Sequence, residues 1–282
     1  MENKPVNPLS KHFRRPVIYF KLPSGGKFWP EGSLNLPVTG DIPVYPMTTA
    51  DEVTLKTPDA LMNGVGIVNV IQSCCPNIID AWHTPSIDVD AILVAIRIAS
   101  YGQQMPIGSK CPSCGEEHDY DIDLSGILGG INSPDFDTVI EFDGLKIRLR
   151  PQEYFIVNRN NMINFEEQRI LQTINDSDLD DEVKNARLTE SMKKLLDANT
   201  QLLVNSTDYI ETEDGTQVTD DEFLREFYTN VDSKVNKLIE ARLAKIAADG
   251  ALPQIKLACT NCAHQYEVPL EFDYARFFGQ GS

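Results

Sequence analysis

The sequence predicts an α+β fold in which a small β unit is split by a large helical insertion, with a helical region ahead of it. Three observations predict this arrangement: two Cys-x-x-Cys knuckles, strand-like segments beside each knuckle, and a helix-rich stretch between them. The first knuckle is 111–114 and the second is 259–262. A Cys-x-x-Cys knuckle between two strands, occurring twice in the chain, is typical of a zinc ribbon.

The four knuckle cysteines are the candidate metal ligands. Two residues between cysteines let one tight turn direct both sulfurs at one ion, and two such turns complete a closed four-sulfur shell. We therefore expect one structural Zn²⁺ held by Cys111, Cys114, Cys259 and Cys262. The segment between the knuckles is then an insertion whose two ends the metal ion would hold together.

Other cysteine chemistry is less consistent with the sequence. No signal peptide or transmembrane run is found, so we expect a reducing compartment, where a doubled Cys-x-x-Cys favours zinc over disulfides. A redox dithiol needs a thioredoxin-like setting, which is not seen. His118 and His264 are candidate substitute ligands, although four cysteines already complete a site. Cys74 and Cys75 end an apolar helical stretch and are expected to be buried as small hydrophobes.

The charge of the chain is strongly negative and unevenly distributed. The 282 residues carry a net charge of −17, which argues against a general binder of phosphate backbones. Residues 1–30 nevertheless contain six Lys and Arg against the single acid Glu2. Residues 208–222 contain seven acids and no base. This asymmetry predicts either partner docking or a flexible basic arm and a solvated acidic hairpin.

The N-terminal third is predicted to contain an extended part and a helical part. Residues 1–47 form an arm and extended segment, and residues 48–105 form a helical region. Thr48 followed by Asp51 predicts a helix start. The segment 92–99 is apolar almost all round, so we expect it at the buried centre of this part.

The rest of the chain is divided between the β unit and the insertion. Residues 106–150 and 251–282 are predicted to form the zinc-ribbon-like β unit, and residues 151–250 the helical insertion. Asp143-Gly144 between two apolar runs predicts a β-hairpin inside the first of these segments. Thr219 and Glu222 predict a capping box within the insertion.

Two apolar groups near the end of the chain leave an alternative open between core and contact surface. The last helix of the insertion places five apolar residues on one face, and the row is either bundle core or partner-binding surface. These residues are Val235, Leu238, Ile239, Leu243 and Ile246. The C-terminal aromatics, which we expect in the core rather than in a neighbouring subunit, are Phe272, Tyr274, Phe277 and Phe278.

The sequence contains no catalytic constellation. Four scattered histidines, no nucleophile motif and no second metal cluster predict a protein that is not an enzyme. A zinc hydrolase would need an open coordination position, and four thiolates leave none.

Several stretches of the first half, taken in order, resemble the baseplate hub assembly proteins of T4-like contractile-tailed bacteriophages. The similarity covers roughly residues 15–130. The stretches that carry it are Leu22-Pro23-Ser24-Gly25-Gly26 with Phe28, Val44-Tyr45-Pro46-Met47-Thr48 with Asp51-Glu52, Leu55-Lys56-Thr57-Pro58-Asp59-Ala60-Leu61 with Gly64, Asp88-Val89-Asp90 with Ala95-Ile96-Arg97-Ile98-Ala99-Ser100-Tyr101-Gly102, and the Cys111 knuckle.

The resemblance implies a non-enzymatic phage tail protein that acts in assembly of the baseplate hub, as an assembly factor or a hub component. Its expected partners are other tail and baseplate hub proteins, with no nucleic acid and no membrane. It would work in the host cytoplasm during infection; whether it stays in the virion, and its oligomeric state, are left open.

The alternative is a zinc-ribbon module of a phage transcription or replication complex. A basic stripe beside the ribbon would favour that alternative, whereas the residues that follow the first knuckle, 116–123, are rich in acids.

Overall fold

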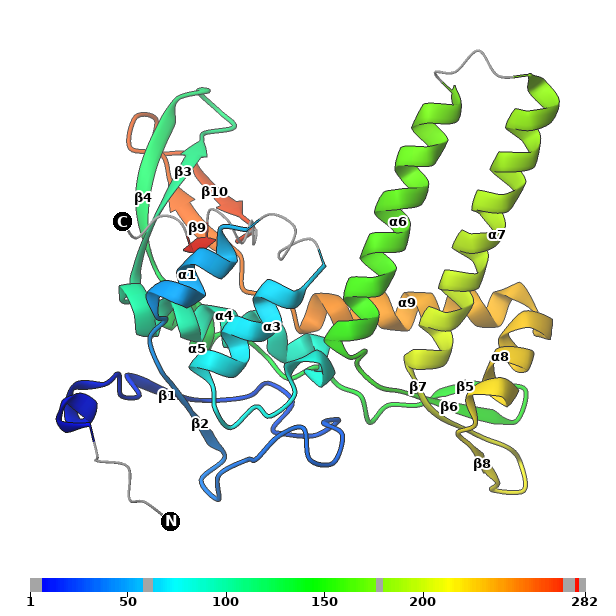
Figure 1. Ribbon diagram of the computed structural model, residues 1–282. Coiled ribbons are helices and arrows are strands. Elements are labelled where there is room, and N and C mark those ends of the chain that lie inside the picture. The colour runs from blue at the N-terminus through cyan, green and yellow to red at the C-terminus, as the bar shows by residue number, and fades with distance from the viewer. Residues whose placement is uncertain (1–6, 58–62, 176–179, 271–276, 279–282) are drawn as a thin grey trace.

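The computed structural model describes residues 7–57, 63–175, 180–270 and 277–278. Helices are combined with small antiparallel sheets, in agreement with the predicted α+β class. Figure 1 shows a lobe that contains both ends of the described chain, a second lobe built from the middle of the chain, and a pair of long helices that projects away from both.

The first lobe is built around one buried helix. Its described elements up to residue 101 are η1 (Pro8–His12), β1 (Ile18–Lys21), β2 (Asp41–Val44), α1 (Thr49–Leu55), α3 (Val65–Cys74), η2 (Ala81–His83) and α4 (Ser86–Tyr101). Ile92 through Ile96 of α4 are fully buried, as the apolar run predicts. Gly102 adopts φ 91° and ends this helix. The predicted start of α1 is confirmed, since Thr48 and Asp51 form a capping box.

Two β-hairpins extend the first core beyond these helices. The first is β3 (Gln104–Lys110) with β4 (Glu117–Asp123), followed by α5 (Leu124–Gly129); the second is β9 (Ile255–Ala258) with β10 (Gln265–Val268). Met105 and Ile122 from one hairpin and Ile255 and Leu257 from the other are buried in the same core as α4. The hairpins therefore share one apolar base, although they are separate two-stranded sheets.

The described aromatic residues near the C-terminus belong to this core as well. Phe277 and Phe278 are buried in the first core, and Phe277 lies against the buried guanidinium of Arg97. This agrees with the expected core role for these two residues. Phe272 and Tyr274 lie outside the described residues.

The second lobe combines a four-stranded sheet with four helices. Its elements are β5 (Ile140–Phe142), β6 (Leu145–Leu149), α6 (Tyr154–Asn175), α7 (Asp181–Asn205), β7 (Thr207–Glu211), β8 (Gln217–Val218), α8 (Asp221–Asn230) and α9 (Ser233–Asp249). The sheet order is β5-β6-β7-β8, with Ile147 opposite Ile210. The apolar side chains of this sheet, α8 and α9 form a second core.

The predicted hairpin at Asp143-Gly144 is present. The sequence predicts it within the segment 106–150, and in the structure its strand β6 also pairs with β7 of the segment 151–250. Ile147 and Leu149 on β6 are almost completely buried in the second core, so this strand needs the insertion to cover its apolar face. The predicted cap of α8 is also displaced by one residue: Asp220, rather than Thr219, accepts hydrogen bonds from the backbone of Glu222 and Phe223.

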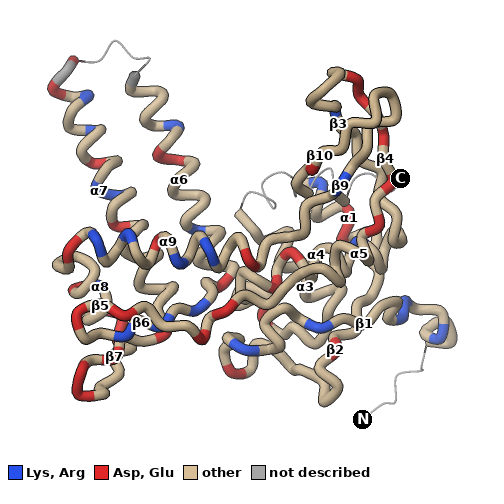
Figure 2. The backbone as a smooth tube through the Cα atoms, turned by 180° about the vertical axis from the view of Figure 1, so that it is seen from behind, with Lys and Arg blue, Asp and Glu red and all other residues tan. Residues whose placement is uncertain are grey.

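The long helices α6 and α7 lie side by side, and α6 is fixed at its base to the first lobe (Figure 1). Ser86 N donates to the carbonyl of Gln152 at 2.7 Å, and Tyr154 N donates to the carbonyl of Thr84 at 2.8 Å. The Trp82 ring also stacks on Tyr154 at 5.9 Å. Both signs of charge alternate along the projecting pair (Figure 2). Among the described helices, none combines the length and the apolar character needed to cross a bilayer.

Candidate metal centre

The two knuckles meet, and their four sulfurs form one compact cluster. All four Sγ atoms of Cys111, Cys114, Cys259 and Cys262 lie within 4.8 Å of one another. The shortest distances join opposite knuckles: 3.7 Å between Cys111 and Cys262, and 3.6 Å between Cys114 and Cys259. All six cysteines are free thiols. The residues that spacing singled out are therefore brought together across more than a hundred positions of sequence.

Each knuckle is shaped by the same backbone turn. Gly115 N donates to the carbonyl of Cys111 at 2.9 Å, and Ala263 N donates to the carbonyl of Cys259 at 2.9 Å. The residue that follows the second cysteine has positive φ in both knuckles, 76° at Gly115 and 58° at Ala263. This left-handed residue reverses the chain so that both sulfurs of a knuckle point to one side. Two copies of one turn thus face each other.

The cluster fits the donor set of a structural zinc site. A tetrahedron with Zn–S bonds of about 2.3 Å has sulfur–sulfur edges of about 3.8 Å, close to the two cross-knuckle distances. Cys111 and Cys259 are buried, whereas Cys114 and Cys262 are exposed. The buried pair holds the site to the lobe, and the exposed pair leaves a route for an ion from solvent.

A histidine and two tyrosines link the hairpins around the sulfurs. The Nε2 atom of His118 lies 3.5 Å from Sγ of Cys259, and its Nδ1 lies 3.0 Å from the hydroxyl of Thr260. The Tyr266 hydroxyl contacts that of Tyr120 at 3.3 Å across the two hairpins, and this hydrogen bond is the largest cause of a raised pKa at Tyr120. The sequence names His118 as a candidate substitute ligand beside four cysteines that already complete a site. In the structure its ring contacts the thiol of Cys259, as a histidine that supports a ligand would.

The thiols of the cluster differ in acidity. Hydrogen bonds from the backbone of Cys262, then Asn261, lower the pKa of Cys259 to about 6. The backbone of His264 lowers the pKa of Cys262, but partial desolvation and the neighbouring thiols outweigh this effect and raise it to about 11. The cluster thus presents a ready thiolate at Cys259, which is the form that binds a metal.

The other candidate substitute ligand, His264, stacks its ring on Tyr266, with 6.2 Å between ring centroids. Cys74 and Cys75 are fully buried in the first core, as expected, and burial raises the pKa of Cys74 to about 12.

The predicted partner-binding row on α9 divides into two groups. Val235, Ile239 and Ile246 are buried in the second core, and Leu243 packs against that core. Leu238 is 47% exposed. The helix therefore turns most of this row inward and presents Leu238 outward, a distinction that periodicity alone did not make.

Comparison with protein-family models gives a match over almost the whole chain. The family model described as "T4 bacteriophage base plate protein" matches residues 16–279, which include both knuckles and everything between them. No curated protein and no solved structure matches the chain. Because the match covers far more than half of the sequence, the chain belongs to the T4 bacteriophage base plate protein family.

Proposed function

We propose that this protein is a non-enzymatic part of the phage tail that acts in assembly of the baseplate hub, as an assembly factor or a hub component. The observation that carries the proposal is the family match over residues 16–279. The candidate metal centre agrees with it, because four cysteines leave no open position at which a substrate could bind a metal.

We propose further that the cysteine cluster is a split zinc ribbon whose role is structural. Zinc bound by Cys111, Cys114, Cys259 and Cys262 would join two hairpins that do not pair with each other. It would also close the chain at both ends of the helical insertion 151–250. Because such a site does not exist in the unfolded chain, metal binding would contribute directly to folding.

The domain organisation proposed here has two units. Residues 1–47, 48–105 and the ribbon segments would act together, because their described residues share the first core. The insertion 151–250 would act with the hairpin 140–149, with which it shares the second core. The second unit, with its projecting helices, would present contact surfaces at a fixed distance from the ribbon (Figure 1).

The partners proposed are other phage tail and baseplate hub proteins, with neither nucleic acid nor membrane among them. A net charge of −17 repels phosphate at long range. Of the row on α9, Leu238 is the member whose side chain is half exposed, so it is proposed as a contact residue. The protein would act in the host cytoplasm during assembly, with the tail baseplate as the place where a retained copy would be found.

Recovery of the tagged protein from infected cells tests this function. We expect baseplate hub proteins to co-purify, and proteomics of purified virions in parallel will show whether the protein stays in the particle. Co-purification of polymerase or replication proteins without any tail protein would contradict the proposal.

A further inference from the structure

An apolar groove lies between α8 and the sheet of the second lobe. It has a volume of about 620 Å³ and is lined by side chains of both elements. Ile210 and Leu224 are buried on its floor, whereas Phe223 on its wall is 63% exposed. An exposed aromatic at the edge of an apolar groove is typical of a docking surface.

The surroundings of this groove are acidic. Glu226 lines it, and the segment 208–222 beside it contains seven acids and no base. Figure 2 shows these acids gathered around β7 and α8. Two bases on the elements that form the groove are already paired: Lys146 with Glu211 at 2.9 Å, and Arg225 with Asp197 at 2.9 Å. An occupant that suits the groove would therefore be apolar with basic residues beside the apolar ones.

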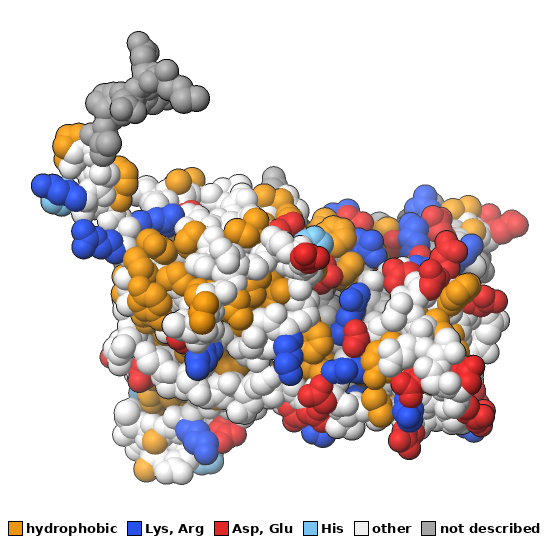
Figure 3. Space-filling view, turned by 90° about the horizontal axis from the view of Figure 1, so that it is seen from below, with side chains coloured by type: hydrophobic (Ala, Val, Ile, Leu, Met, Phe, Trp, Pro, Cys, Tyr) orange, Lys and Arg blue, Asp and Glu red, His pale blue; other side chains and the backbone are white. Residues whose placement is uncertain are grey.

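The N-terminal arm, residues 7–13, has this chemistry. Leu9 is 63% exposed and Phe13 is 59% exposed, so the arm presents two large apolar side chains to solvent. Lys11 and Arg15 are exposed between and beside them. Figure 3 shows basic and apolar side chains together on this arm, away from the body of the molecule.

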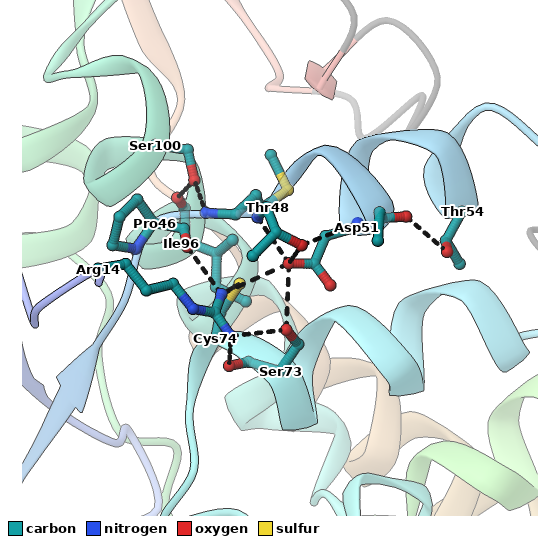
Figure 4. Close-up of polar contacts among 11 residues, drawn as sticks. Arg14, Pro46, Thr48, Asp51, Thr54, Ser73, Cys74, Ile96 and Ser100 are labelled. Carbon is teal, nitrogen blue, oxygen red and sulfur yellow. Dashed lines mark hydrogen bonds and ion pairs between the residues drawn. The ribbon is translucent and has the colours of Figure 1, made fainter. Parts of the chain in front are cut away.

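Arg14 fixes the point at which the arm leaves the body. Its guanidinium donates to the carbonyl of Pro46 at 2.8 Å, to the carbonyl of Ser73 at 2.8 Å and to the Ser73 hydroxyl at 2.9 Å (Figure 4). It also contacts the Asp51 carboxylate at 3.4 Å. Because this clamp holds residue 14, the preceding residues project as a short arm instead of folding back onto the lobe.

We propose that the arm of one copy of this protein seats in the groove of a second copy, with Leu9 and Phe13 on the apolar floor and Lys11 and Arg15 against the acidic rim. The arm and the groove lie at opposite ends of the molecule, so one chain cannot fill its own groove (Figure 1). The proposal goes beyond the hub assignment and does not depend on it or on zinc.

This contact is heterologous, since it joins two different surfaces. Each copy keeps a free arm and a free groove after pairing, so association continues until a ring closes or an open chain forms. We therefore expect species larger than a dimer, and an association that weakens as salt screens the charges.

Charge exchange between the two surfaces tests the proposal. In the arm variant, Lys11→Glu is combined with Arg15→Glu; in the rim variant, Glu222→Lys is combined with Glu226→Lys. All four side chains are exposed, so both variants are expected to fold. Sedimentation velocity of the full chain at low salt should show association weakened on the order of tenfold in each variant alone. A mixture of the two should associate again, because each arm then meets a groove of opposite charge.

A matched control reverses two exposed bases elsewhere, Lys193→Glu with Lys237→Glu, and should leave association unchanged. A photo-crosslinking phenylalanine analogue at Phe13 should join to α8 of another copy. Wild-type protein that stays monomeric at low salt would overturn the proposal. The occupant of the groove would then be a basic helix of a different protein. Association that the arm and rim variants leave intact, or crosslinks to another face, would overturn it too.

Discussion

The buried carboxylate of Asp88 holds in place a loop that lies more than sixty residues earlier in the sequence. Asp88 on α4 is fully buried and accepts hydrogen bonds from the Ser24 backbone at 2.8 Å, the Ser24 hydroxyl at 2.5 Å and the Trp29 indole at 2.9 Å. One side chain thus holds the Leu22–Gly26 loop against the central helix. Burial raises the pKa of Asp88 to about 6, although these hydrogen bonds act in the opposite direction.

The raised pKa of Asp88 makes stability depend on pH. The folded protein holds this proton more tightly than the unfolded chain, whose ordinary value is 3.8, so the contribution of Asp88 is largest below that value and is lost as pH rises through about 6. The difference corresponds to about 3 kcal/mol. We expect the stability advantage of wild type over Asp88→Asn, measured by urea unfolding, to shrink across this range. Asp90 titrates in the same window but is present in both proteins, so it cancels. A constant or growing advantage would contradict the assignment.

The start of α8 offers a test with its own control. Asp220 accepts from the backbone N–H groups of Glu222 and Phe223 at 3.0 and 3.1 Å, and Thr219 precedes it. Asp220→Ala should lower the free energy of unfolding by about 1 kcal/mol, because the first turn loses its acceptor. Thr219→Ala, the cap expected from the sequence, should change it little. The reverse order in urea unfolding would contradict the observed cap.

Two neighbouring residues on α9, one buried and one half exposed, allow the core role and the contact role of this helix to be tested separately. Leu238 is half exposed, whereas Ile239 is fully buried in the second core. Ile239→Asp should unfold the second lobe, because a buried charge without a partner is costly. Leu238→Asp should keep the circular dichroism of wild type and, on the proposed contact role, should reduce recovery of hub partners from infected cells. A folded Leu238→Asp variant with undiminished recovery would remove Leu238 from the contact surface.

Across the whole chain, the structures that depend on nearby residues could be predicted from the sequence, and the pairings between distant segments could not. The spacing of the cysteines identified the four residues of the cluster, and an apolar run identified the buried helix α4. Turn residues identified the hairpin at Asp143-Gly144 because its pattern lies within ten residues. Its partner β7, however, lies about sixty positions further along, and no local pattern specifies such a pairing.

The features of the candidate site that could not be predicted are also contacts between residues that are far apart in the sequence. The cross-knuckle pairs and the contact of His118 with Cys259 arise only when residues 141 to 151 positions apart in the sequence meet. The signal for His118 was its position near the first knuckle, but proximity in sequence could not separate a ligand from a support. Only the acidic run 208–222 beside the groove was visible in the sequence, because the groove joins Leu145 to residues 210–231, which are far apart along the chain.

If one zinc ion joins the two knuckles, as proposed, elemental analysis with native mass spectrometry will find it in protein purified without added metal. We expect one zinc per chain in the wild type. Cys259→Ser should lose the zinc together with thermal stability of the first lobe, whereas the matched variant Ser113→Ala, which changes an exposed knuckle residue outside the four cysteines, should retain it. A fully folded wild-type protein without metal would rule out the proposed zinc site.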